Sequence, residues 1–290
     1  MKWRRIHIEI GIIGAGRVGT TMGKYIMVHG GNVQGFYSRT PDSAREAAQF
    51  CNTNYFKDLD SLIEVSDTLF ITTNDGAIKE IWDCIAKKNV KGKVICHFSG
   101  SLSSDIFSNK ESSGAIVCSV HPIYAFSNKF TAYQNLTEAL FTVEGDAEAL
   151  KRMQEVFALL PNRIVEIPTN AKAKYHAAAS IASNQVTGLL WMAIELLKES
   201  GITEEIAYDM LEPLVKNSID TIFFNGCKEA LTGPIERGDL GTVEKHLKAL
   251  EKPLWNQAYR AAGSLVTELA KEKNPDKDYG EIEQLLRESK

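Results

Sequence analysis

The sequence predicts an α/β fold, in which a doubly wound, mostly parallel sheet is followed by an all-α domain. Strand-like and helix-like segments alternate through residues 1–168, an order typical of parallel strands with helices on both faces. The strand-like segments are rich in isoleucine and valine, as strands buried on both faces are. No strand-like run follows Pro168, so we expect one domain over 1–168 and a helical domain over 169–290.

The first domain contains seven predicted strands, with helical patterns between several of them. Each strand is a short apolar run bounded by turn residues, and each helix repeats its apolar residues along one face. The strands are expected at 6–13, 32–37, 68–72, 94–98, 115–120, 140–144 and 163–167. The helices are expected at 18–28, 41–50, 76–88 and 146–160.

The second domain is predicted to be helical throughout. One long helix is expected over 170–200, about 45 Å if continuous at 1.5 Å per residue. Further helices are expected at 203–225, 242–250, 252–273 and 280–288. Apolar residues at 177–179, 181, 182, 189, 190 and 192 surround most of the long helix, more than one small domain readily covers. We therefore expect a homodimer built through this domain.

A glycine-rich turn lies between the first predicted strand and the first predicted helix. Three glycines spell G-x-G-x-x-G there, which lets backbone amides approach a pyrophosphate at the helix N-terminus. The predicted cofactor contacts in this turn are Gly14, Ala15, Gly16, Arg17, Val18 and Gly19. This context predicts a Rossmann-type dinucleotide site, and the alternative is a glycine turn without a ligand.

The residues after the second predicted strand indicate which dinucleotide is bound. An NAD site usually has an acidic residue about 20 residues beyond the glycine turn, but the first acid here is Asp42. Ser38, Arg39 and Thr40 instead offer a guanidinium and two hydroxyls, which suit a 2′-phosphate. Arg17 could add a second cation. We therefore predict NADP(H); alternatively, Arg39 is solvated and the segment only caps the next helix.

Polar residues at two later strand ends are further predicted cofactor contacts. Thr72, Thr73 and Asn74 follow the third strand, and Ser99 follows the fourth. Ligands of open α/β sheets bind at the carboxyl ends of the strands, so these side chains are expected near the ribose and nicotinamide. Asn74 could instead cap the helix that follows it.

Two histidines lie at strand ends on the same side of the predicted sheet. His97 and His121 are therefore candidates for contact with nicotinamide or substrate. A lone histidine is more often structural, and His121, which precedes Pro122 at a strand end, is the stronger candidate.

A polar stripe runs along the predicted long helix. Lys172, His176, Ser180 and Asn184 recur every four residues and share one face. Such a stripe on an apolar helix faces water, a partner or a cleft. An exposed position suits Lys172 well and Asn184 poorly. A cleft at the domain junction is the alternative for the polar residues of the stripe that an exposed position does not suit.

Composition limits the possible partners and location. A net charge of −4, without a basic run interleaved with aromatics, gives no reason to expect nucleic acid. Five cysteines without a CxxC pair favour a reducing cytoplasm over a disulfide framework. The six histidines lack zinc-site spacing, so no metal is expected.

No membrane contact is expected from the apolar stretches. The segment after MKWRR is interrupted by His7 and Glu9, which argues against a signal peptide. The stretch 176–197 contains His176 and Asn184 among other polar residues, which favours a buried helix over a membrane span.

Together these motifs resemble a family of Rossmann-like NADP oxidoreductases with a helical C-terminal domain of formerly unknown function. GxGxxG, SRT, HFSGS, HP, the KYHAAASIASN helix and LTGPIERGD carry the resemblance, which spans nearly the whole chain. The family is similar to ketopantoate reductases, pyrroline-5-carboxylate reductases, deazaflavin-dependent NADP reductases and prephenate dehydrogenases.

The resemblance also implies which residues are catalytic. Ketopantoate reductases carry Lys, Asn and Asn spaced by four on this helix, where the present chain has His176, Ser180 and Asn184. Prephenate dehydrogenases carry a serine and then a catalytic His–Pro, matched by Ser101 and His121–Pro122, but the lysine after that serine is absent. The resemblance thus implies His121, His176 and Asn184 as catalytic residues.

The function expected from these observations is NADPH-dependent reduction of a small 2-oxo acid, with 2-ketopantoate the best named candidate. Hydride would reach a carbonyl carbon while His121 or His176 protonates the oxygen and Asn184 orients the carbonyl. The alternatives are a dehydrogenase of the prephenate type and a non-catalytic NADP(H) sensor that grips a partner through its helical domain.

Overall fold

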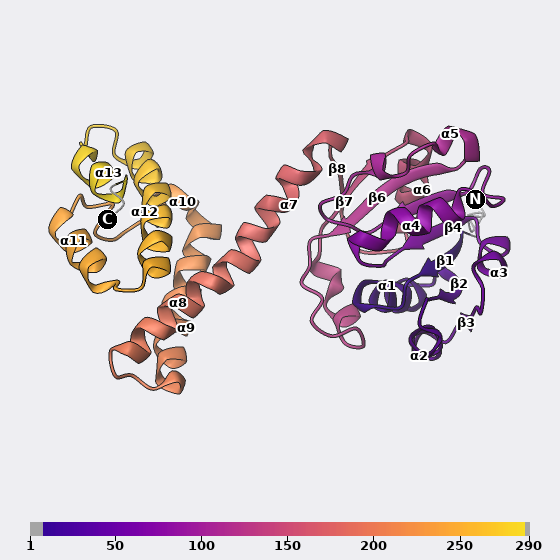
Figure 1. Ribbon diagram of the computed structural model, residues 1–290, viewed down its shortest axis with the longest axis horizontal. Coiled ribbons are helices and arrows are strands. Elements are labelled where there is room, and N and C mark those ends of the chain that lie inside the picture. The colour runs from indigo at the N-terminus through magenta and orange to yellow at the C-terminus, as the bar shows by residue number, and fades with distance from the viewer. Residues whose placement is uncertain (1–7, 288–290) are drawn as a thin grey trace. The chain divides into compact units, whose positions relative to one another are not determined.

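The structure, a computed structural model, describes residues 8–287 of the chain. The start of the first predicted strand at 6–7 and the end of the last predicted helix at 288 lie outside these residues. The chain forms two compact units, Met1–Ser180 and Ile181–Lys290. In Figure 1 the first runs from indigo to pink and the second from orange to yellow.

The first unit is built on one eight-stranded sheet in the order β3-β2-β1-β4-β5-β6-β7-β8. β1 to β6 pair in parallel, β7 pairs antiparallel with β6, and β8 is parallel to β7. The order of β1 to β6 is that of a doubly wound dinucleotide-binding sheet. The strands are β1 Glu9–Ile13, β2 Asn32–Tyr37, β3 Asn54–Tyr55, β4 Thr68–Ile71, β5 Val94–His97, β6 Ile116–Pro122, β7 Phe141–Gly145 and β8 Ile164–Glu166.

Helices cover both faces of this sheet. α1 (Arg17–Val28), α2 (Pro41–Cys51) and α6 (Ala147–Phe157) pack on one face, where Met22, Phe36 and Phe157 belong to one apolar core. α3 (Leu59–Glu64) and α4 (Asp75–Ile85) pack on the other, where Trp82 is fully buried. Short helical pieces complete the unit: η1 Ser104–Ile106, α5 Lys110–Ser113, η2 Ala132–Gln134, η3 Leu136–Glu138, η4 Thr169–Ala171 and α7 Lys172–Ser180.

The second unit is helical. It begins with a π-helical turn, η5 Ile181–Gln185, which leads into α8 Val186–Glu199. Two small apolar cores hold its helices together, one around Val243 and Ile282 and one around Met192 and Trp255. The remaining helices are α9 Glu204–Asn225, α10 Cys227–Ala230, α11 Leu240–Ala249, α12 Pro253–Lys273 and α13 Gly280–Arg287.

The predicted fold class is confirmed, with local differences. β3 and α3 were not expected, because two residues and six residues are too few to show a repeating pattern of apolar side chains. Asp58 caps α3 by accepting a hydrogen bond from Ser61 N at 2.8 Å. The expected helix over 170–200 contains the π-helical turn η5. Among residues 8–287, no helix combines the length and apolar character needed to cross a bilayer.

Candidate cofactor and active site

A cavity of about 640 Å³ opens at the carboxyl ends of β1, β2 and β4. The three strands end side by side because they are parallel neighbours, so their following loops share one edge. Nine predicted cofactor residues line this cavity: Gly14, Ala15, Gly16, Ser38, Arg39, Thr40, Thr72, Thr73 and Asn74. The structure therefore brings the glycine turn, the SRT segment and the TTN segment together.

The glycine turn has the geometry that a close backbone approach needs. Gly14 adopts φ +110°, and its N–H donates to Tyr37 O at 2.8 Å, which ties the turn to β2. A Cβ at Gly19 would lie 2.2 Å from Gly14 O, whereas one at Gly16 would meet nothing within 4 Å. Gly16 supplies no side-chain cap to α1, so the first amides of that helix can bind an anion.

The remaining residues of the glycine turn lie beside the cavity rather than in its lining. Arg17 is exposed at the first position of α1, Val18 is partly buried, and Gly19 is buried under the turn. Gly19 thus has a packing role, because only a glycine lets α1 pass this close to Gly14.

The cavity contains donors suited to a charged ligand. Arg39 and Thr40 are exposed at its edge, and within residues 8–287 Arg39 has no ion pair. Asp42, the first acid after Arg39 in the sequence, is paired with Arg45 at 2.8 Å. The hydroxyl of Thr73 is buried and has no hydrogen-bond partner in the same described range. A free guanidinium and an unpaired buried hydroxyl in one cavity fit a phosphorylated dinucleotide.

One wall of the cavity was missed by the sequence-based prediction. The lining residues that were not predicted are Ile13, Tyr37, Leu59, Gly76, Ala77, Glu80, Ile81 and Cys84. Five of them lie on α4 at positions 76, 77, 80, 81 and 84, the spacing of one helical face. That spacing is visible in the sequence and could have identified them.

The polar strand ends also hold their own loops in place. Asn74 Oδ1 accepts from Ala77 N at 3.1 Å, so Asn74 caps α4 as well as lining the cavity. Ser99 lies outside the cavity lining: its hydroxyl donates to Asp75 at 2.7 Å and accepts from Ser101 N and Leu102 N. These bonds brace the loop that follows β5.

His97 is one of the groups that brace this loop. It is fully buried at the end of β5, its Nε2 lies 3.1 Å from Ser103 O, and its Nδ1 accepts from Ser99 N at 3.2 Å. Burial lowers its pKa to about 4, so the ring is neutral near pH 7. Both ring nitrogens of His97 are engaged with backbone atoms of the loop, so this histidine has the structural role and does not contact a ligand.

A second group of aromatic side chains assembles within the first unit. His121, near the end of β6, lies against Tyr175 and His176 of α7. Tyr175 Oη is 2.8 Å from His121 Nδ1, and the two histidine rings cross with their centroids 5.6 Å apart. The structure therefore unites His121 and His176, and adds Tyr175, which was not among the predicted site residues.

Gly100 makes room for the histidine pair. A Cβ at this residue would lie 2.4 Å from His176 Nδ1 and 2.7 Å from His121 Nε2. The two nitrogens therefore converge over the one residue of the Ser99–Ser101 loop that has no side chain. His176 Nδ1 is buried, and no group within the described part of the chain bonds to it.

The surroundings keep His121 neutral and Tyr175 protonated. Burial, the charge of Lys172 and the neighbouring His176 lower the pKa of His121 to about 4. Burial raises the pKa of Tyr175 above that of a free phenol. At pH 7 the pair is thus an uncharged imidazole bonded to an intact phenol.

Lys172 is buried, which makes its expected exposure wrong. Only 1% of the residue is exposed, and among residues 8–287 its Nζ has no hydrogen-bond partner. The first turn of α7 lies against the strand ends, close enough for the charges of Glu144 and Asp75 to act on the amine. Burial lowers the pKa of Lys172, a shift that a solvated lysine would not show.

Asn184 belongs to the second unit. It lies in the π-helical turn η5, is exposed, and accepts from Ser183 Oγ at 3.2 Å. π-Helical turns are often found at functional sites. Its catalytic role stays a prediction.

Family models cover most of the chain. Residues 2–122 match the model of a Rossmann-like domain, and residues 139–266 match the domain of unknown function DUF2520. The chain thus couples these two domains, in agreement with the resemblance drawn from its motifs. No curated protein matches the sequence.

Solved structures share the fold over nearly their whole length. A Bacteroides fragilis protein provisionally described as an NADP oxidoreductase is 24% identical, with a TM-score of 0.74 over 90% of this chain and 98% of that one. Protein TM1727 of Thermotoga maritima is 24% identical, with a TM-score of 0.69 over 91% and 99%. A reductive aminase of Aspergillus terreus, in complex with NADPH and ethyl-5-oxohexanoate, is 16% identical, with a TM-score of 0.71 over 97% and 99%.

Proposed function

We propose that this chain, in which a Rossmann-like domain precedes a DUF2520 domain, is an NADP(H)-dependent oxidoreductase that reduces a C=O or C=N bond of a small molecule. The observation that carries the proposal is the cavity in which the glycine turn, the unpaired Arg39 and the buried Thr73 hydroxyl meet. The likeness to a reductive aminase that holds NADPH supports the same cofactor.

The cavity residues have distinct parts in cofactor binding. The first amides of α1 and the glycine turn would hold the pyrophosphate, and Ser38, Arg39 and Thr40 would hold a 2′-phosphate. Leu59, Ile81 and Ala77 offer an apolar wall to the adenine. Bound NADPH supplies the hydride, and the protein must supply the proton.

His121 is the proposed proton donor. Because the phenol of Tyr175 stays protonated, it can donate to His121 Nδ1, which leaves the imidazole proton on Nε2. Nε2 is the nitrogen that faces Gly100, so its proton can pass to the substrate oxygen or nitrogen as the hydride arrives. The Tyr175 proton can then move to Nδ1 and keep the ring uncharged.

The best substrate candidate remains a small 2-oxo acid, with 2-ketopantoate the one to name first. An imine is the second candidate, because one protein of similar structure is named a reductive aminase, a name that implies reduction of a C=N bond. A dehydrogenase of the prephenate type and a non-catalytic NADP(H) sensor are two further candidate functions. We also propose that the helical domain, residues 169–290, contributes to substrate binding and dimerisation and that the free thiols reflect a cytoplasmic protein.

A substrate panel tests the proposal directly. NADPH oxidation is followed by its loss of absorbance with 2-ketopantoate, with several 2-oxo acids besides it, with neutral ketones and with cyclic imines. Turnover of any of them supports an oxidoreductase and ranks the carbonyl and imine classes. Tight NADPH binding without turnover of any compound would favour the sensor.

Cofactor choice gives a sharper test of the SRT segment. NADPH is expected to bind at least about tenfold tighter than NADH, as one charge-assisted phosphate contact allows. Arg39→Asp should abolish or reverse this preference, because it replaces the free guanidinium with a carboxylate. Fluorescence titration of both cofactors measures the ratio, with Arg45→Asp as control, since Arg45 is paired with Asp42 outside the cavity lining. A wild type that prefers NADH would contradict the assignment.

We propose that the protein is a homodimer and that the second unit forms the interface. Phe223 and Phe224 at the end of α9 are 86% and 90% exposed, and Trp191 and Leu214 are more than half exposed. An apolar groove of about 340 Å³ lies between α8 and α9. So much exposed apolar surface on one small unit is unusual for a monomer. Met192, named in the predicted interface, is instead buried against Leu250 and Trp255.

Light scattering tests the dimer. The wild type is expected to have the mass of two chains at micromolar concentration. Phe223→Ser with Phe224→Ser should yield monomers, because both rings lie on the surface and their loss removes apolar area only from the interface. Leu265→Ser, at a position on α12 that is 74% exposed, serves as the control. A monomeric wild type would refute the proposal.

A further inference from the structure

Lys172 is the charged group in the first unit that its surroundings satisfy least. Its amine is completely buried, yet within residues 8–287 no acceptor lies at hydrogen-bond distance from Nζ. The ring of Tyr175 lies nearby, with its centroid 5.9 Å from Nζ. A buried ammonium without an acceptor is costly, so its retention calls for an explanation in terms of a ligand.

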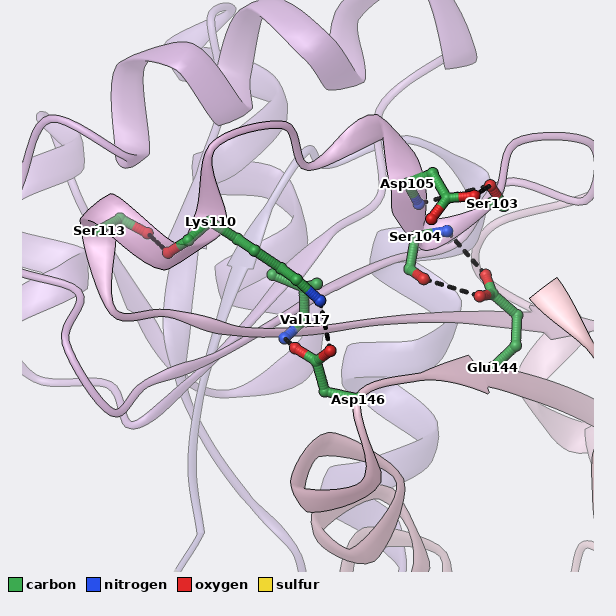
Figure 2. Close-up of polar contacts among 8 residues, drawn as sticks. All are labelled: Ser103, Ser104, Asp105, Lys110, Ser113, Val117, Glu144 and Asp146. Atoms are coloured by element: carbon green, nitrogen blue, oxygen red, sulfur yellow. Dashed lines mark hydrogen bonds and ion pairs between the residues drawn. The ribbon is translucent and has the colours of Figure 1, made fainter.

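The two carboxylates whose charges act on Lys172 bond to serines and not to its amine. Glu144, which is also buried, accepts from Ser104 N at 2.8 Å and from Ser104 Oγ at 2.7 Å, and Figure 2 shows both of its oxygens turned to that serine. Asp75 accepts from Ser99 Oγ and Ser101 Oγ. Asp146, the next acid beyond β7, bonds Val117 N and Lys110 (Figure 2).

The amine of Lys172 is therefore left without an acceptor among residues 8–287. The other polar members of this cluster are the neutral pair of His121 and Tyr175 and the buried, unpartnered Nδ1 of His176. The positive charge of Lys172 lowers the pKa of His121, so the amine lies close enough to the proposed proton donor to affect it electrostatically. His121, Tyr175 and His176 are each only partly buried, so the cluster is not closed off from solvent.

We propose that Lys172 is an anion receptor and that the ligand of this site carries a carboxylate beside the bond that is reduced. The amine receives the carboxylate, while the reducible group lies against His121 Nε2. This inference rests on the proposed function, since it names the substrate class of the same site. It favours acids over neutral ketones because a carboxylate both accepts a hydrogen bond from the ammonium and pairs with its charge, whereas a ketone oxygen offers only a weaker, neutral acceptor.

Binding of a matched pair of unreactive ligands tests the receptor. Oxamate and oxamide have nearly the same shape, but only oxamate carries a carboxylate. Calorimetric titration, with and without saturating NADP⁺, should show oxamate binding to the wild type at least about tenfold tighter than oxamide. Lys172→Met, which keeps the length of the side chain, should reduce this ratio to about twofold or less.

Controls separate the receptor from general charge effects. Lys174→Met removes an exposed lysine from the same helix and should keep the wild-type ratio. Lys172→Met should also raise the melting temperature of the ligand-free protein, because it removes a buried charge without a partner. Inorganic phosphate in place of oxamate shows whether the site takes any anion.

Several results would overturn the receptor. They are equal binding of oxamate and oxamide to the wild type, no oxamate binding at all, or an unchanged ratio in Lys172→Met. Its failure is distinguishable from failure of the proposed function. If neutral ketones are turned over and oxamate binding does not depend on Lys172, only the receptor proposal is wrong. If oxamate binding depends on Lys172 but no compound is turned over, only the proposed reductase function is wrong.

Discussion

Replacing His121 with alanine is expected to lower kcat for NADPH oxidation roughly a hundredfold or more, the usual effect of losing a positioned general acid. The Kd for NADPH should change little, because His121 lies outside the lining of the cofactor cavity. The reason for the large effect is the position of Nε2, which faces the glycine loop beside His176 while Nδ1 is held by Tyr175. Steady-state kinetics and a fluorescence titration of NADPH measure the two quantities.

The second unit supplies a matched control for this substitution. His246 Nδ1 lies 2.8 Å from Tyr259 Oη, the same pairing as His121 with Tyr175, but on α11 and α12. His246→Ala should therefore leave kcat unchanged. If His121→Ala kept its activity while His176→Asn lost it, the proton would come from His176, at the lysine position of the ketopantoate enzymes. In that case His176→Lys should retain some turnover.

Tyr175 holds the imidazole of His121 in one tautomer and supplies the proton that replaces the one given up at Nε2. Tyr175→Phe should lower kcat at least about tenfold, because it removes both the hydrogen bond and that proton. Nitrogen NMR spectra of the histidine ring report the tautomer directly and should show the proton on Nε2 in the wild type. Tyr259→Phe is the matched control. A wild-type spectrum with the proton on Nδ1 would rule out donation from Nε2.

The pH dependence follows from the neutral state of His121. Its pKa is lowered to about 4, so the ring is uncharged at every pH above that value. Activity should therefore stay level from about pH 8 down to about pH 5, because the ring keeps its Nε2 proton and its bond to Tyr175 throughout this range. A loss of kcat centred near about pH 6.5 would instead indicate a solvated histidine.

Local sequence patterns predicted the doubly wound sheet well because its strands are short, apolar and separated by amphipathic helices. The order of β1 to β6 follows from right-handed crossovers between such strands. β3 was not predicted, because two residues are too few to show the alternation of a strand. Its position in the sheet is set by the pairing of Gly35 with Asn54. The π-helical turn at Ile181–Gln185 was missed because none of its residues is a glycine or proline that would interrupt the helical pattern.

The sequence predicted the parts of the site that depend on backbone conformation. It predicted poorly the parts that depend on which side chains are buried. The glycine turn and the SRT segment have fixed sequence spacing, and both line the cavity. Lys172 looked like a solvated residue because four-residue spacing gives a face but not its surroundings. The partner of His121 was missed because Tyr175 is 54 residues away and lies off the stripe that begins at Lys172.

Replacing Gly19 with alanine is expected to have the largest effect on stability. Its Cβ would lie 2.2 Å from the backbone oxygen of Gly14 and 2.4 Å from Thr72 Oγ1. Backbone bonds from Gly14 N to Tyr37 O and from Thr72 N to Ile13 O hold both residues in place. Thr72 already donates to Gly14 O at 2.9 Å, so the methyl would also disrupt that bond. Overpacking of this kind should lower the free energy of unfolding by about 3 kcal/mol or more. Differential scanning calorimetry should show the first unit melting roughly 6–12 °C earlier.

Gly16→Ala should separate cofactor binding from stability. A Cβ at Gly16 meets no atom within 4 Å, so the melting temperature should match the wild type. Gly16 nevertheless lines the cavity, and its methyl would occupy space that a pyrophosphate needs beside the α1 N-terminus. NADPH should therefore bind at least about tenfold more weakly. Gly188→Ala, a helical glycine of the second unit with open space around it, should leave NADPH binding unchanged. If Gly16→Ala bound NADPH normally, the pyrophosphate would lie elsewhere, and if Gly19→Ala were as stable as the wild type, α1 would not pack this closely on the turn.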